Sequence, residues 1–110
     1  MKILPRYEEA VIPLRKLTEY ALLPQKDSDK AKAFWLALGY TKDHANELMQ
    51  KILEALPLYE ARPKGHNGYG ETYEVVMMIT GRNGKTAKVL TGWIDDEDNG
   101  EMRLTTVHVD

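Results

Sequence analysis

Cysteine is absent from the 110-residue chain, histidine occurs only three times, and the net charge is −2 at neutral pH. The lack of cysteine excludes a disulfide framework and any zinc site with a thiolate ligand, and scattered histidines disfavour a histidine-rich metal site. We therefore expect neither a metal nor another cofactor. The slightly negative charge argues against a nonspecific nucleic-acid binder, which is usually clearly basic, although it leaves room for a local basic cleft.

Long hydrophobic runs are also missing. No apolar stretch approaches the roughly 20 residues of a membrane span, and residues 1–6 lack the apolar core of a signal peptide, so we expect a cytoplasmic protein with no membrane partner. Hydrophobic residues make up 43% and charged residues 29% of the chain, as in ordinary globular proteins. This length and composition predict one domain over residues 1–110.

The strongest pattern is a β-hairpin within residues 69–94. Two segments alternate with period two on either side of the turn 80–85, and one set of alternating positions is mostly apolar: Val75, Met77, Ile79, Ala87, Val89, Thr91 and Trp93. Alternation around a glycine-containing turn predicts two antiparallel strands. A further strand is predicted at residues 103–109. Strict alternation there predicts one face with Arg103, Thr105, Val107 and Val109, and another with Leu104, Thr106 and His108.

Helical periodicity precedes the strands. A short helix is predicted at residues 14–23, before Pro24, and a longer one from Asp29 to Leu38. The spacing in the longer helix predicts one buried stripe, made of Ala31, Phe34, Trp35 and Leu38. A third helix is predicted after the N-cap Thr41, ending at Leu56 before Pro57.

The segment between the third helix and the hairpin is rich in proline and glycine. Residues 58–61 are compatible with a short strand, and the remainder, carrying Arg62, Lys64 and His66, is predicted as a loop. Helices followed by hairpin-linked strands predict an α+β domain. Its N-terminal helices should pack on one face of a small antiparallel sheet of three to four strands.

Several segments, taken together and in order, resemble a bacterial domain family that occurs as small free-standing proteins and as the last domain of large secreted polymorphic toxins. They are residues 16–22, 30–34, 38–40, 69–73, 80–87, 91–94 and 103–106. The resemblance covers about residues 12–109 and leaves residues 1–12 as an N-terminal extension. Members often carry a His-Pro loop before the second helix, where this chain has Gln25–Asp29.

The order of helices then sheet, together with the toxin context, is similar to the barnase, EndoU, colicin and RelE-like group of metal-independent ribonucleases. The resemblance implies a toxin-like domain that cleaves RNA by transphosphorylation, with RNA as substrate and a cognate antitoxin or immunity protein as partner. The alternative is a non-catalytic interaction protein: an antitoxin, immunity protein or inhibitor that binds a protein partner through its sheet face or edge.

Such cleavage needs a base, an acid, and cations or hydrogen-bond donors on the phosphate. The predicted catalytic residues are Lys30, Tyr73, Arg103 and Thr105, and the predicted substrate-binding residues are Lys88, Thr91 and Trp93. His66 and His108 are candidates for acid or base work, because histidine is the side chain that most readily exchanges a proton near neutral pH. Each candidate also has an ordinary structural interpretation: solvated charges for the lysines and Arg103, surface positions for the histidines, and core packing for Thr91 and Trp93.

Overall fold

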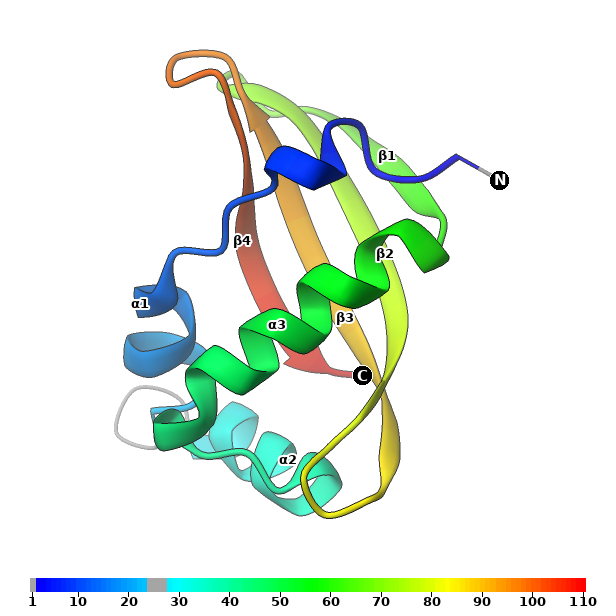
Figure 1. Cartoon of the computed structure of the whole chain (residues 1–110). Coiled ribbons are helices and arrows are strands. Elements are labelled where there is room, and N and C mark those ends of the chain that lie inside the picture. Colours follow the sequence, from blue (N-terminus) through cyan, green and yellow to red (C-terminus); the bar gives the residue numbers. More distant parts are fainter. Residues whose placement is uncertain (1, 24–27) are drawn as a thin grey trace.

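The computed structural model describes residues 2–23 and 28–110 and confirms an α+β fold (Figure 1). Its four strands form one antiparallel sheet in the order β1-β2-β3-β4. The bounds are Ala61–His66 for β1, Gly70–Thr80 for β2, Thr86–Asp96 for β3 and Glu101–Val109 for β4. The predicted stop at Pro24 and most of the loop 25–29 lie outside the described residues.

The β2–β3 pair is the predicted antiparallel hairpin. Val75 lies opposite Thr91, Met77 opposite Val89, and Tyr73 opposite Trp93. The segment predicted as a loop after residue 61 is instead the edge strand β1, so that prediction was wrong. Pro63 and Gly65 obscured the strand because both disfavour strand interiors; here they occupy a sheet edge and flank a break in the register.

All described helices precede the sheet. They are η1 (Tyr7–Glu9), α1 (Leu14–Lys16), η2 (Leu17–Ala21), α2 (Ser28–Leu38), η3 (Lys42–His44), α3 (Ala45–Ala55) and η4 (Leu56–Leu58). Helix α3 runs diagonally across one face of the sheet (Figure 1). Its buried residues Leu48 and Ile52 join Val75, Met77 and Val89 in one hydrophobic core. No described helix is long and apolar enough to cross a membrane.

Helix α2 packs against the end of the sheet through a narrower stripe than predicted. Ala31, Phe34 and Leu38 are buried, but Trp35 is 55% exposed, so its predicted burial was wrong. Successive residues of an α-helix are about 100° apart around its axis. Ala31, Phe34 and Leu38, at positions i, i+3 and i+7, already fill the contact between α2 and the sheet. A Cβ at Gly81 would lie 2.2 Å from the Leu38 carbonyl oxygen, so this glycine allows the turn after β2 to approach the end of α2.

The N-terminal segment covers the first half of the outer edge of β4. The Val11 amide donates to the Met102 carbonyl at 2.8 Å, and the Leu104 amide donates to the Val11 carbonyl at 2.9 Å. Leu4 and Ile12 are buried in the core. Residues 2–12 therefore contribute to the packed structure. The N-terminal segment does not cover the second half of the β4 edge.

A β-bulge in β4 changes which residues share a face. Gly92 lies opposite Thr106 while the next residue, Trp93, lies opposite Leu104, so Thr105 is an extra residue in β4. The alternation predicted for residues 103–109 was therefore wrong. The bulge turns Leu104 toward the core and leaves Arg103 on the same face as His108.

Candidate functional site

The candidate site is the sheet face turned away from α3, which we call the open face. Helix α3 covers the opposite face (Figure 1), where its buried residues join the hydrophobic core. Register and alternation assign to it these polar residues and an apolar strip between them: Arg62, Glu74, Lys88, Arg103, Thr106 and His108, with Val76, Met78 and Leu90. These side chains are exposed or half-buried, whereas Val75, Met77 and Val89 on the other face are fully buried.

Glu74 lies at the centre of one row across the open face. It is in register with Arg62 on β1 and with Gly92 on β3, and Gly92 is in register with Thr106 on β4. A Cβ at Gly92 would lie 2.6 Å from the Thr106 methyl group and 3.3 Å from the Thr105 hydroxyl. Both threonine side chains therefore lean over Gly92, about 10 Å from Glu74 by the spacing of strands.

His108 lies in the next row of the open face after that of Glu74, and Lys88 lies in the row after that. His108 is opposite Leu90, and Lys88 is opposite Met78. Within the part of the chain that the structure describes, the side chains of Arg62, Glu74, Lys88 and His108 make no hydrogen bond or ion pair. A carboxylate, an imidazole and two cations on one exposed face form a set that can bind an anion and exchange protons.

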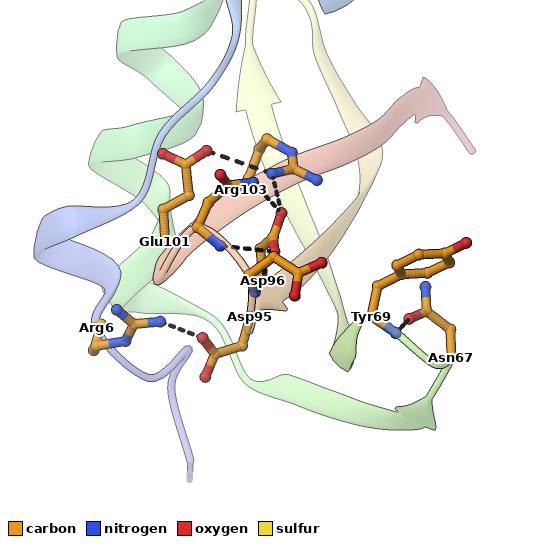
Figure 2. A network of polar contacts seen from close by, with 9 residues as sticks. Arg6, Asn67, Tyr69, Asp95, Asp96, Glu101 and Arg103 are labelled. Carbon is orange, nitrogen blue, oxygen red and sulfur yellow. Dashed lines mark hydrogen bonds and ion pairs between the residues drawn. The ribbon is translucent and has the colours of Figure 1, made fainter.

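Arg103 lies on the same face but is held by carboxylates (Figure 2). Its guanidinium donates to Asp96 Oδ2 at 2.6 Å and to Glu101 Oε1 at 3.4 Å. Asp96 also accepts from the Asn99 side chain at 2.9 Å and from the Asp98 amide at 2.9 Å. The Arg103 bond lowers the pKa of Asp96 well below its usual value, and Asp96 in turn raises the pKa of Arg103.

The Asp96–Arg103 contact should make stability depend on pH. The pKa of Asp96 in the folded protein is below its usual value of 3.8, so ionised Asp96 stabilises the fold. This stabilisation is complete above pH 3.8 and is lost as the pH falls through the folded pKa. Asp96→Asn should therefore be less stable than the wild type at pH 7, and the difference should shrink toward pH 2. Urea denaturation at a series of pH values measures it.

Asp98→Asn is the matched control for this prediction. Asp98 is exposed, and the contact it makes with Asp96 comes from its backbone amide. The control should follow the wild type throughout. A constant difference between Asp96→Asn and wild type from pH 7 to pH 2 would show that the Asp96 charge does not stabilise the fold.

A depression of about 120 Å³ opens beside the second half of β4. It is lined by Lys16, Ala21, Lys30, Thr105, Thr106 and Val107. Two predicted catalytic residues, Lys30 and Thr105, therefore meet at one place although they lie far apart in sequence. Because Thr105 and Thr106 also lean over Gly92, the depression adjoins the open face.

Three other predicted site residues lie on the covered face of the sheet. The Thr91 hydroxyl donates to the Val75 carbonyl at 2.8 Å and accepts from Trp93 Nε1 at 2.8 Å. Thr91 is 0% and Trp93 1% exposed, which leaves neither side chain any surface for a substrate. The core-packing interpretation of both is confirmed. Tyr73 is half-buried against the same core.

The sequence interpretation missed Glu74, Arg62 and Lys16 as site residues. Glu74 carried a usable signal, since a charged residue amid the alternating apolar positions of a strand must face away from the core. Arg62 was missed because its segment was predicted as a loop. Lys16 approaches Lys30 only through the packing of η2 and α2 against β4, which local sequence does not reveal.

His66 is engaged locally, in contrast to His108. Its Nε2 lies 2.6 Å from Glu97 Oε1, and its Nδ1 accepts from the Gly68 amide at 3.0 Å. Both ring nitrogens are therefore occupied at the exposed edge of β1. His66 is the weaker candidate for proton transfer and serves as a control for His108.

The fold defines a small α+β domain with one helix-covered and one open sheet face. The chain belongs to the family described as a domain of unknown function, DUF6883, whose model matches residues 3–110. Comparisons with curated proteins and with solved structures find no significant match.

Proposed function

We propose that this domain is a metal-independent endoribonuclease of the toxin type, and that RNA binds across the open face. One observation carries the proposal: Glu74 and His108 share this face with Arg62 and Lys88, and no described residue pairs with any of them. Proton transfer by a carboxylate and an imidazole, with cations on the phosphate, is the chemistry that cleavage through the ribose 2′-hydroxyl requires.

In the proposed reaction, the Glu74 carboxylate accepts the proton of the 2′-hydroxyl. The 2′-oxygen then forms a bond to phosphorus, and the bond from phosphorus to the 5′-oxygen breaks. A protonated His108 donates a proton to that leaving oxygen. The products are a 2′,3′-cyclic phosphate and a 5′-hydroxyl, so that atoms and charge balance without a metal.

The spacing of the sheet accommodates a phosphodiester between the two groups. Glu74 and His108 lie two strands apart across the sheet and two residues apart along it, which places their α-carbons about 12 Å apart. Lys88 and Arg62 supply the positive charge that stabilises the transition state.

The toxin part of the proposal rests on the segments that resemble the polymorphic-toxin family. This resemblance implies a cognate antitoxin or immunity protein that covers the open face and blocks RNA binding.

The second candidate function, a non-catalytic interaction protein, is supported by the apolar strip on the open face. The strip consists of Val76, Met78, which is 46% exposed, and Leu90. Such a strip suits a protein partner.

Induced expression in a bacterial culture tests the proposal. Wild-type protein should arrest growth and yield discrete RNA fragments, because RNA is cleaved at defined sites. His108→Gln should restore growth and leave RNA intact at equal protein level, since the glutamine amide does not transfer protons. The matched control His66→Gln should behave like the wild type. Unchanged growth and intact RNA with abundant soluble wild-type protein would favour the interaction protein instead.

A further inference from the structure

The depression beside β4 lies next to the open face and carries two lysines of its own. Lys16 is contributed by α1 and Lys30 by α2, while Thr105 and Thr106 provide hydroxyls from the bulged strand. Ala21 and Val107 form its apolar wall. No part of the reaction described above uses this depression.

Its position and chemistry suit one phosphate group. The volume of about 120 Å³ exceeds that of a few water molecules, and its polar lining consists of two cations and two hydroxyl groups. Asp29 is exposed next to Lys30 and reduces the local positive charge. Cations with hydroxyl donors are the usual partners of a phosphate in nucleic-acid binding.

The depression is also continuous with the proposed path of RNA. Thr105 and Thr106 line it and at the same time lean over Gly92, which lies in the row of Glu74. A strand that places its scissile phosphate near Glu74 and leaves the sheet past β4 must cross these two threonines. The next phosphates of that strand then reach the two lysines.

We propose that this depression is a phosphate-binding subsite for the RNA backbone flanking the cleavage point. The inference rests on the proposed function for the direction of the strand. With this subsite, the protein should prefer a single-stranded oligonucleotide to a dinucleotide as substrate, because a dinucleotide has no second phosphate to occupy the subsite. Binding through this subsite is sequence-independent and salt-sensitive.

Binding of uncleavable 2′-deoxy oligonucleotides tests the subsite without relying on catalysis. Fluorescence anisotropy would compare a labelled hexanucleotide with a labelled dinucleotide on the wild type and on Lys16→Met/Lys30→Met. The double variant should bind the hexanucleotide about tenfold more weakly and the dinucleotide equally well. A plot of the logarithm of the association constant against the logarithm of the salt concentration has a negative slope. For the hexanucleotide, the magnitude of this slope should be about 0.7 smaller in the double variant, as expected for the loss of one phosphate contact to a single strand.

The control Lys32→Met/Lys51→Met removes the same charge from exposed positions on α2 and α3 and should match the wild type. Lys16→Arg/Lys30→Arg keeps the charge and should retain tight binding, which keeps the test valid if the methionine variant fails to fold. Equal losses for both oligonucleotides, equal losses in the control, or no wild-type binding would overturn the subsite. Length-dependent, lysine-dependent binding by a protein that cleaves no RNA would support the subsite and overturn the nuclease.

Discussion

Replacing Glu74 with glutamine should lower the rate of RNA cleavage by about two to four orders of magnitude, the usual contribution of a positioned acid or base. Glutamine has nearly the same shape but its amide cannot accept the proton of the 2′-hydroxyl. Glu74 lies on a half-buried strand surface and makes no hydrogen bond to any described residue, so the change should leave stability nearly unaltered. Initial cleavage rates on a labelled oligoribonucleotide measure the effect.

Glu71→Gln is the matched control for this experiment. Glu71 is exposed near the start of the same strand and lies opposite His66, away from the row of Glu74. The control should cleave at the wild-type rate, and both variants should bind the 2′-deoxy hexanucleotide as tightly as the wild type does. A Glu74→Gln protein that cleaves normally would show that the proton is accepted elsewhere.

Replacing Trp93 with alanine should cost about 3–5 kcal/mol of the free energy of unfolding, as for other large aromatic residues in cores. Trp93 is 1% exposed and its indole Nε1 donates to the buried Thr91 hydroxyl, so the change leaves both a cavity and an unpaired hydroxyl acceptor. Domains of this size are stable by only about 5–15 kcal/mol. Urea denaturation followed by far-ultraviolet circular dichroism measures the loss.

The other tryptophan supplies the control. Trp35 is 55% exposed on α2, and its replacement by alanine should change stability by no more than about 0.5 kcal/mol. Equal effects of the two changes would contradict the placement of Trp93 in the core. A Trp93→Ala protein that is stable but unable to bind oligonucleotides would instead support the prediction of Trp93 as a substrate-binding residue.

The overall fold was predictable because its strongest signals are local. Period-two alternation around the turn 80–85 predicted the hairpin of β2 and β3, and the stripe including Leu48 and Ile52 predicted α3. Strand β1 was harder, because its proline and glycine are compatible with a strand only at an edge. Whether a strand lies at an edge is known only once the order of the strands in the sheet is known.

The site was only partly predictable from sequence. Lys88 and Arg103 were predicted as polar strand positions, and both lie on strands. The residues with which Arg103 shares a face depend on the bulge at Thr105, which shifts every later side chain of β4 relative to Arg103. Thr91 fits the ordinary interpretation of a buried threonine, since its hydroxyl is satisfied within the core. The meeting of Lys30 with Thr105 required tertiary packing.

The most direct test of the central proposal is to incubate purified wild-type protein with a defined single-stranded RNA in EDTA and to identify the product ends. The proposed reaction yields a 2′,3′-cyclic phosphate and a 5′-hydroxyl, and a single 2′-deoxy substitution should block cleavage at that position. Glu74→Gln protein purified in parallel excludes a contaminating nuclease. Absence of cleavage, or cleavage that EDTA abolishes, would contradict the proposed metal-independent ribonuclease.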